Sequence, residues 1–289
     1  MGDLYLHLGG HRTGSSSLQL AMEMNAEAFH GAGIDTAYPS RDGAQGGRLR
    51  LRLLKRVTGG QGPIANAERV RAHLKDHMRD DTRSLLVSDE NVLGAVAELA
   101  AGHFYRTVRR RCRVLGAALW TQPRRVVLVT RPYGDLFASA YRFQASIAPV
   151  APFEDVVSAM ETFKGGWLRP IEHIMGFLKP QELVVVDYSK RGSSAALLGR
   201  LTGLEGLKEP ARRVNLSATD AAIVAIQARL ASGQDASRET LRDLVVEHCH
   251  DTQDFGIAAI PQALNAALLQ RYEADLDEVS KRSDVTLVR

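Results

Sequence analysis

Short apolar runs recur along the chain and are separated by segments in which apolar residues follow helical spacing. The two strongest runs, RRVVLVT and ELVVVDYS, contain several consecutive β-branched residues. Uninterrupted apolar runs are typical of strands buried on both faces, and intervening helices are typical of the crossover connections of a parallel sheet. The predicted strands are Leu4–Leu8, Ile34–Tyr38, Ser84–Ser88, Arg125–Thr130 and Glu182–Asp187. The predicted helices are Ser15–Phe29, His103–Leu119, Tyr133–Gln144, Gly166–Leu178 and Ser193–Leu201.

This alternation predicts an α/β fold, with a parallel sheet of about five strands flanked by helices. The chain has 289 residues, close to the size at which a single core stops growing, so residues 1–289 are predicted to form one domain. Residues 39–68 are rich in Gly and Arg with weak periodicity, and they predict a loop-rich insertion with a short helix inside. Residues 217–289 have helical spacing and no further strand signal, so we expect a C-terminal helical layer packed on the sheet.

The composition is that of an ordinary globular protein, with 45% hydrophobic and 24% charged residues. The formal net charge of +4 suits an anionic ligand but is far below that of a dedicated nucleic-acid binder, so no nucleic-acid partner is expected. Cys112 and Cys249 are too few for a disulfide framework, which favours a reducing compartment. The sequence shows no secretory signal and no apolar run of the roughly 18 residues that a membrane-spanning helix needs. We therefore expect a cytoplasmic protein without a membrane span.

The stretch LHLGGHRTGSSSLQ, residues 6–19, is close to a phosphate-binding loop. The pattern of that loop is G-x-x-x-x-G-K-[ST]. Gly9, Gly14 and Ser16 fit it, whereas Ser15 stands where the lysine should be. The stretch connects a predicted strand to a predicted helix, and a helix N-terminus offers unpaired N–H groups and the positive end of a dipole. The position therefore favours an anion site.

Several side chains of this loop could add contacts to an anion. Ser15, Ser16 and Ser17 bring hydroxyl donors to the first helical turn, and Arg12 supplies the fixed charge that the missing lysine would supply. The structural alternative is a serine-capped helix after a glycine turn, since one glycine-rich loop is weak evidence for a site.

A second motif, VVLVTRPYGDLFASAYRF, follows a later predicted strand. Arg131 ends that strand, and Ser139 lies eight residues further on in the predicted helix. Together they could bind one phosphate, the arginine through a charged fork and the serine through its hydroxyl. The structural alternative is a surface arginine followed by a small residue that faces the core.

The two motifs together resemble the sulfotransferases that use 3′-phosphoadenosine 5′-phosphosulfate. In that family a K-T-G-[ST]-[ST] loop grips the 5′-phosphosulfate, and a later R-x-P-x-x-x-x-x-S pattern grips the 3′-phosphate. Arg131 and Ser139 match the outer residues of the second pattern at the right separation, while its proline is displaced to Pro132. Two further segments resemble the family: Leu85–Gly94 is similar to a segment of bacterial members with carbohydrate-like acceptors, and Arg212–Thr219 to their C-terminal nucleotide-side segment.

The resemblance implies a P-loop NTPase-like sulfotransferase fold and a donor, 3′-phosphoadenosine 5′-phosphosulfate (PAPS), as co-substrate without a metal. The donor-binding residues that it implies are Arg12, Thr13, Gly14, Ser15, Ser16, Ser17, Arg131, Ser139 and Arg212. It also implies a catalytic role for Arg12, where the family more often has lysine. Arginine keeps the positive charge, but it cannot donate a proton at neutral pH, so charge stabilisation survives and acid catalysis by this residue does not.

Sulfuryl transfer to a hydroxyl needs a base, and two residues are candidates. Glu90 follows the strand SLLVS at the carboxyl edge of the predicted sheet, where ligands of open α/β folds bind. His11 lies in the loop and has an unperturbed pKa near neutrality. The alternatives are a helix-capping carboxylate for Glu90 and a solvent-exposed loop residue for His11.

Three other clusters of charged or metal-ligating residues give weaker evidence for a functional site. His73 and His77 have a spacing that can bind metal, but the Glu of H-E-x-x-H and a third ligand are missing, so no metal site is expected. The segment EHCHD, residues 247–251, has ligand types without workable spacing. The basic run Arg106–Arg113 is typical of a solvated helix face, with an anionic acceptor or partner as the alternative.

The sequence thus predicts a sulfotransferase that acts on a hydroxyl of a carbohydrate or other small-molecule acceptor. Two other functions remain open. A P-loop small-molecule kinase would need the missing lysine and an acid for magnesium. A non-catalytic nucleotide-binding protein of the same fold would bind the donor without turnover.

Overall fold

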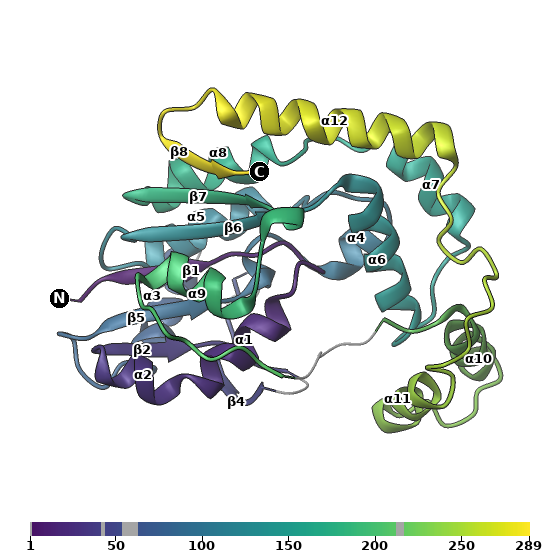
Figure 1. The fold of residues 1–289 in the computed structure, drawn as a ribbon, viewed down its shortest axis with the longest axis horizontal. Helices are drawn as coiled ribbons and strands as arrows, with labels where there is room; N and C mark the ends of the chain where they lie inside the picture. Colours follow the sequence, from purple (N-terminus) through teal and green to yellow (C-terminus); the bar gives the residue numbers. More distant parts are fainter. Residues whose placement is uncertain (1, 42–43, 54–62, 212–216) are drawn as a thin grey trace.

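The computed structural model describes residues 2–41, 44–53, 63–211 and 217–289, and these form an α/β fold (Figure 1). Its main sheet has six parallel strands in the order β2-β5-β1-β6-β7-β8. The strands are β1 (Leu4–His7), β2 (Ile34–Ala37), β5 (Ser84–Ser88), β6 (Arg125–Thr130), β7 (Glu182–Asp187) and β8 (Val285–Val288). The first five confirm the predicted strands to within one residue.

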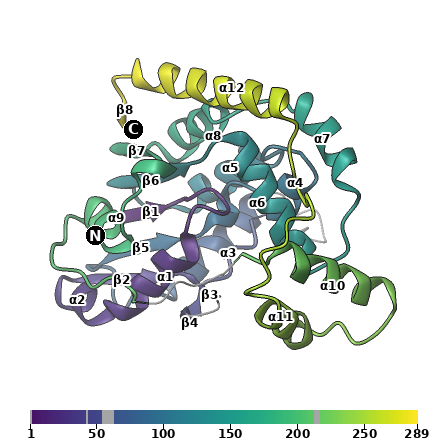
Figure 2. The same cartoon turned by 45° about the vertical axis from the view of Figure 1, so that its right-hand side comes forward.

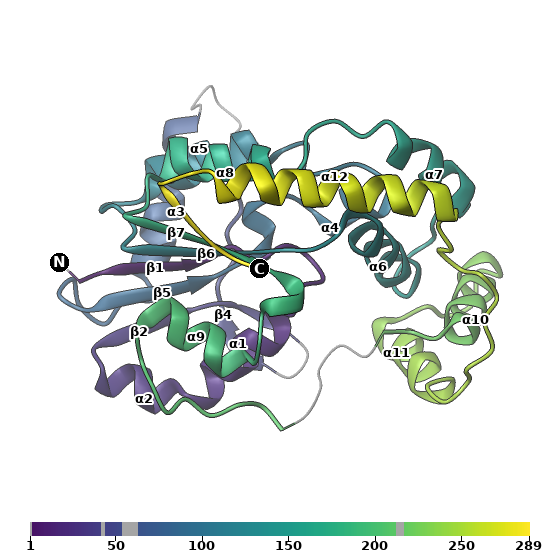
Figure 3. The same cartoon turned by 45° about the horizontal axis from the view of Figure 1, so that its top comes forward.

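Helices cover both faces of the sheet (Figure 3). One face carries α1 (Ser15–Met24), α2 (Ala26–Gly31) and α9 (Ser194–Thr202). The other face carries α3 (Pro63–Lys75), α5 (Val108–Ala118) and α8 (Leu168–His173). Helix α8 continues as a π-helical turn, η2 (Ile174–Leu178). The remaining helices are α4 (Val96–Ala100), α6 (Tyr133–Ala145), α7 (Phe153–Glu161), α10 (Asp220–Ala231), α11 (Arg238–Glu247), α12 (Gln262–Ser280) and the 3₁₀ turns η1 (Glu90–Val92) and η3 (Tyr188–Lys190).

The apolar strand residues divide between two cores because successive side chains of a strand point to opposite faces. On β6, Val127 and Val129 pack under α1 and α9, whereas Val126 and Leu128 pack under α5. Strands β1 and β7 alternate in the same way. This two-sided burial is the physical reason for the uninterrupted apolar runs.

Three expectations about the architecture need correction. The sheet has six strands, not about five, because β8 adds a parallel strand beside β7, so the expected lack of any strand after residue 217 is wrong. Within residues 39–68, strands β3 (Pro39–Arg41) and β4 (Ala44–Arg48) form an antiparallel pair, and the expected short helix is the start of α3, which runs on to Lys75. The third correction concerns the C-terminal helical layer that was expected on the sheet. Helices α10 and α11 of this region instead lie to one side of the sheet, beyond α6 (Figure 2).

The chain connections reverse direction at β1. From β1 the chain crosses to β2 through α1 on one face, and from β5 it crosses to β6 through α5 on the other, although β5 and β6 flank β1 on both sides. At such a reversal the loops that follow the neighbouring strands run in opposite directions and leave space between them. Ligands of open α/β sheets bind at the carboxyl ends of the strands at this point. The loops after β1, β5, β6 and β7 all meet at this edge.

Candidate functional site

The loop after β1 turns tightly, and two glycines are required by its packing. A Cβ on Gly9 would lie 2.6 Å from Nε2 of His7, and one on Gly10 would lie 2.8 Å from Cη2 of Trp167. Gly14, with φ +90°, occupies the N-cap of α1, and Arg12 also has a left-handed backbone, with φ +61°. A left-handed conformation is uncommon for a residue with a side chain, and such residues are frequent at ligand-binding sites.

The first turn of α1 has two features that would favour a bound anion. Gly14 offers no side-chain oxygen, so no side-chain cap closes the helix start. The hydroxyl of Ser15 is buried and has no hydrogen-bond partner among the described residues. A buried hydroxyl without a partner costs free energy, and the positive end of the helix dipole lies beside it. An anionic oxygen would satisfy both features.

The other hydroxyls of the loop are used within the protein. Thr13 donates its hydroxyl to the carbonyl of Gly10 over 2.6 Å, which stabilises the turn. The hydroxyl of Ser17 lies 2.9 Å from that of Ser194 at the start of α9. Ser16 is half-buried in the first turn. Of the predicted serines, Ser15 is therefore the one whose hydroxyl lacks a described partner.

Arg12 reaches across to the second motif. Its Nε donates to the hydroxyl of Ser139 over 3.1 Å, and its guanidinium lies 4.9 Å from the ring centre of Phe143. Burial and the charge of Arg131 lower the pKa of Arg12. Two guanidinium groups this close repel each other, so an anion bound between them would be favourable.

Arg131 approaches the same point from the end of β6. Its Nη1 donates to the carbonyl of Arg12 over 2.8 Å, and its guanidinium lies 4.9 Å from the ring centre of Tyr188. Its Nε is buried without a partner among the described residues. A donor of this kind is available to an oxyanion, which an arginine binds through its planar fork.

A third arginine, Arg191, completes the cluster and was not found from the sequence. Its Nη2 donates to the carbonyl of Gly14 over 3.2 Å and to the hydroxyl of Ser194 over 2.9 Å, while its Nε is buried without a described partner. Burial lowers the pKa of Arg191. The signal in the sequence was the run KRGSS just after a buried strand, since that position lies at the same sheet edge as the loop after β1.

The three arginines are not neutralised by ion pairs within the described residues, although the charge of Glu209 acts on Arg191. Across the described ranges, no ion pair joins Arg12, Arg131 or Arg191 to a carboxylate. Partly buried cations are usually paired, because burial penalises an isolated charge. The cluster can therefore hold a multiply charged anion, such as a phosphate or sulfate group.

Trp167 forms the back wall of the loop. Its indole Nε1 donates to the carbonyl of Arg131 over 2.9 Å, and its backbone N–H donates to Asp275 over 2.8 Å and to the hydroxyl of Tyr133 over 2.7 Å. Tyr133 also donates its hydroxyl to Asp275. The indole is fully buried and lies against Gly10, so it fixes the loop and the Arg131 backbone at the same time.

Glu90, one of the two candidate bases, is buried at the carboxyl end of β5. Gln19 on α1 donates its amide to Glu90 Oε2 over 3.3 Å and to the hydroxyl of Ser88 over 3.4 Å. The cap of η1 is Asp89, whose Oδ1 accepts from the backbone N–H of Asn91 over 2.9 Å. The capping role considered for Glu90 is therefore filled by its neighbour.

His11, the other candidate base, is also buried, so the alternative of a solvent-exposed loop residue is wrong. Its backbone N–H donates to the hydroxyl of Tyr105 over 2.9 Å, and its Nδ1 lies 3.4 Å from the same oxygen. His11 is thus fixed within the loop by Tyr105.

A second histidine, His7, lies at the end of β1, before the loop. Its Nδ1 is 2.9 Å from the hydroxyl of Ser88, on the neighbouring strand. The pKa of His7 is lowered to about 3, mainly by burial and also by the positive charge of Arg191. The negative charge of Glu90 has the opposite effect and raises this pKa, but it is the smallest of the three. His7 is therefore neutral at physiological pH and joins the loop after β1 to the loop after β5.

Three further residues considered in the sequence analysis are Arg212, His73 and His77. Arg212 lies outside the described residues. His73 and His77 have their ring centres 5.2 Å apart, and His73 Nε2 accepts from the backbone N–H of Arg50 over 2.9 Å. In the part of the chain that the structure describes, no three His, Cys, Asp or Glu residues gather in a way that could hold a metal ion. Nor does any helix within the described ranges have the length and apolar character to cross a membrane.

The structure brings together Arg12, Ser15, Arg131 and Ser139 at one sheet edge, with Glu90 at the end of the adjacent strand β5. Comparison of the sequence with models of known protein families finds no match, and comparison with curated proteins finds none either. The function is therefore inferred from the geometry of the site.

Proposed function

We propose that the protein is a sulfotransferase with a P-loop-type fold, which moves the sulfuryl group of PAPS to a hydroxyl of a carbohydrate or other small molecule. The observation that carries the proposal is the contact between Arg12 and Ser139, with Arg131 bound to the Arg12 backbone and no described carboxylate paired to either arginine. The two anion-binding motifs of the sequence thus meet. A donor with phosphates at both its 5′ and 3′ positions fits two adjoining cationic sites better than a donor with one phosphate chain does.

In this proposal the helix start binds the 5′-phosphosulfate. The hydroxyl of Ser15 and the N-terminal turn of α1 face its oxygens, and Arg191, held by Gly14 and Ser194, adds positive charge at the same turn. Arg131 and Ser139 bind the 3′-phosphate. Arg12 lies between the two groups, because its backbone belongs to the loop and its side chain contacts Ser139.

The reaction is an in-line transfer. The acceptor hydroxyl loses its proton to Glu90 while its oxygen forms a bond to sulfur. The bond between sulfur and the bridging phosphate oxygen breaks, and its electron pair stays on that oxygen, which leaves as part of 3′-phosphoadenosine 5′-phosphate. The arginines stabilise the charge that develops on the leaving phosphate, so positioning and electrostatics supply most of the rate. Protein cations take the part that a metal plays in many phosphoryl transfers.

One observation favours a second candidate, a non-catalytic nucleotide-binding protein. The Arg12 side chain is directed to Ser139 and Phe143, so it contributes to the second anion site as well as to the loop. If it stays there when donor is bound, it strengthens binding without stabilising the leaving phosphate.

A ligand panel tests the proposal directly. A ligand that binds only the folded state raises the melting temperature, so we expect a large increase with 3′-phosphoadenosine 5′-phosphate and a much smaller one with AMP, ATP or GTP. Arg131→Gln should remove most of the difference between the bisphosphate and AMP, while Arg110→Gln, at an exposed position on α5, should retain it. Equal shifts with all ligands would contradict the proposal, and a preference for ATP would support a kinase instead.

A further inference from the structure

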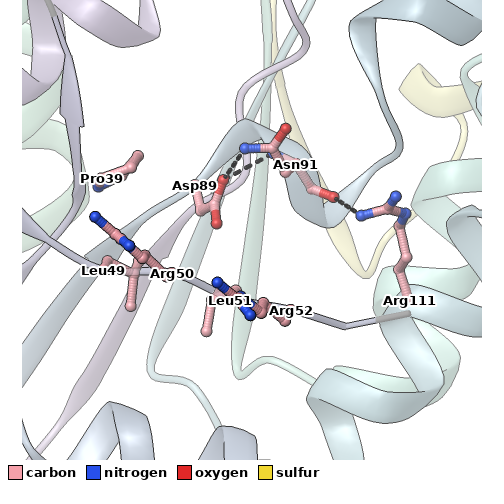
Figure 4. A pocket seen from close by; sticks show the side chains of 8 residues that line it. All are labelled: Pro39, Leu49, Arg50, Leu51, Arg52, Asp89, Asn91 and Arg111. Carbon is pink, nitrogen blue, oxygen red and sulfur yellow. Dashed lines mark hydrogen bonds between the residues drawn. The ribbon is translucent and has the colours of Figure 1, made fainter. Parts of the chain in front are cut away.

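A cavity of about 360 Å³ opens beside Asp89 and Asn91 (Figure 4). The residues that line it are Pro39, Leu49, Arg50, Leu51, Arg52, Asp89, Asn91 and Arg111. Asp89 and Asn91 flank Glu90 in the chain, so the cavity lies next to the carboxyl end of β5. Its volume is in the range of small-molecule sites.

The cavity is lined with more positive than negative charge. Among its described lining residues, three arginines face a single carboxylate, that of Asp89. Oδ1 of that carboxylate already accepts from the backbone N–H of Asn91 over 2.9 Å and from its side-chain amide over 2.8 Å. Asp89 therefore shapes the turn after β5, and the arginines give the cavity its positive character.

Arg111 is held in a fixed orientation at the cavity wall. Its Nε donates to the hydroxyl of Thr107 over 2.9 Å, and its Nη1 donates to the carbonyl of Asn91 over 2.8 Å. Burial lowers the pKa of Arg111. A guanidinium anchored at two nitrogens loses little side-chain entropy when its remaining donors bind a ligand.

Arg50 and Arg52 approach from the opposite wall (Figure 4). Both side chains are exposed, and within the described residues neither makes an ion pair. Their backbones are fixed by α3, because His73 Nε2 accepts from Arg50 N–H over 2.9 Å and Arg69 donates to the Arg52 carbonyl over 3.0 Å. The two arginines also line a second cavity, of about 380 Å³, which they share with Arg69 and His73.

We infer that the acceptor is anionic: a hydroxyl compound that already carries a carboxylate or sulfate group, which Arg111, Arg50 and Arg52 bind. This inference rests on the proposed sulfotransferase activity. With the anionic group in the cavity, another part of the acceptor extends towards Glu90 at the adjacent position in the chain. The second cavity continues the positive lining, so an acceptor with several negative groups, such as an acidic oligosaccharide, has further places to bind.

The test uses three tetrasaccharide probes that differ in one group. One contains glucuronic acid, the second is its carboxyl-reduced neutral form, and the third is the neutral form with one sulfate ester. Binding is measured calorimetrically on protein saturated with 3′-phosphoadenosine 5′-phosphate. We expect at least one anionic probe to bind the wild-type protein at least tenfold more tightly than the neutral probe, and the comparison of the two anionic probes identifies the preferred group.

Three variants assign the effect to the cavity. Arg111→Gln should abolish most of the preference for the anionic probe. The double variant Arg50→Gln/Arg52→Gln, at two exposed positions, should weaken this preference without changing the contacts of Arg111. It therefore provides a test even if Arg111→Gln fails to fold. Arg109→Gln is the matched control, because Arg109 is exposed on the same helix and does not line the cavity. Equal affinity for charged and neutral probes, no binding of either, or an equal loss in Arg109→Gln would overturn the inference.

Sulfate transfer from PAPS to the same three probes is measured in separate samples that contain no 3′-phosphoadenosine 5′-phosphate, which separates the two proposals. Preferential binding of the anionic probe without transfer from PAPS contradicts the sulfotransferase function and leaves an anion-binding cavity. Transfer to neutral probes that is as efficient as transfer to anionic ones keeps the function and contradicts the anionic acceptor.

Discussion

Nε of Arg12 donates a hydrogen bond to the hydroxyl of Ser139 over 3.1 Å, and this contact joins two segments that lie 127 residues apart in the chain. One segment is the loop after β1 and the other is the helix after β6, the strand paired with β1. The contact therefore connects the two motifs that we propose to bind anions through a single side chain. A change at either residue should affect both sites.

Loss of the second anion site should reduce donor discrimination. Arg131→Gln and Ser139→Ala should each weaken binding of 3′-phosphoadenosine 5′-phosphate by about tenfold or more, because hydrogen bonds to charged groups contribute roughly 1.5–3 kcal/mol each. Binding of AMP, which lacks the 3′-phosphate, should change little. Calorimetric titration of both ligands checks this, and an equal loss for the two nucleotides would place the 3′-phosphate elsewhere.

Substitutions of Arg12 distinguish a sulfotransferase from a non-catalytic nucleotide-binding protein. If its interaction is stronger in the transition state than with bound donor, Arg12→Ala should lower turnover by more than it weakens donor binding. Arg12→Lys should recover part of the loss, because it keeps the charge on a shorter side chain without the fork. Hydrolysis of PAPS without acceptor provides the assay. A wild-type protein that binds PAPS, sulfates no hydroxyl compound and hydrolyses donor no faster than Arg12→Ala is a non-catalytic binder.

Glu90 and His11 are distinguished by parallel substitution. Glu90→Gln should reduce turnover by roughly a hundredfold or more with donor binding nearly unchanged, as expected when a general base is lost. His11→Asn should have the smaller effect on turnover at saturating donor, because Nδ1 of His11 lies beside the hydroxyl of Tyr105. A larger effect for His11→Asn would transfer the role of base to that histidine.

His7 should make the folded state sensitive to acid. Its pKa in the folded state is about 3, below the ordinary value of 6.5, so between these values the unfolded chain binds a proton that the folded chain does not. The free energy of unfolding should therefore fall as the pH drops through this window, with a contribution of up to about 1.4 kcal/mol per pH unit. Above pH 6.5 the contribution is constant.

Urea unfolding at a series of pH values measures this dependence. His7→Asn should have a shallower slope than the wild-type protein below pH 6.5. The half-buried His77, whose pKa is lowered to about 4 mainly by burial, contributes a slope of its own. The exposed His250→Asn is the control and should leave the slope as in the wild-type protein. Identical slopes for His7→Asn and wild type would show that His7 titrates normally.

The sheet core was predictable because the physical signal is local. Strands β1, β5, β6 and β7 each carry their buried residues in one continuous run, so they could be predicted without knowledge of their partners. The helix predicted over residues 15–29 instead divides at Asn25, whose side chain donates to the carbonyls of Ala21 and Lys208, the second being 183 residues away. Strand β8 is short and only partly buried, so its apolar residues do not stand out from the helix before it.

The site was predictable only in part, since its residues come from separate strand ends. Arg131 and Ser139 belong to one continuous motif, and the loop of residues 9–17 belongs to another, so each could be read in the sequence. Arg191 has no motif of its own, and its contact with Gly14 follows from the strand order and the length of the side chain. The Arg50–Arg52 segment was hidden for the same reason, because its place beside Asp89 depends on how α3 holds it.

The contacts of Trp167 with Asp275 and of Tyr133 with Asp275 span 108 and 142 residues, respectively. Contacts of such separation carry a large loop-closure cost and form slowly, so they tend to complete folding. During synthesis the glycine loop is among the first parts of the chain to emerge, yet the wall that holds Gly10 and Arg131 in place closes only after α12 has been made. A nascent chain stopped before Asp275 should thus lack a formed donor site even when its first strands have paired, and ligand binding should mark the arrival of α12.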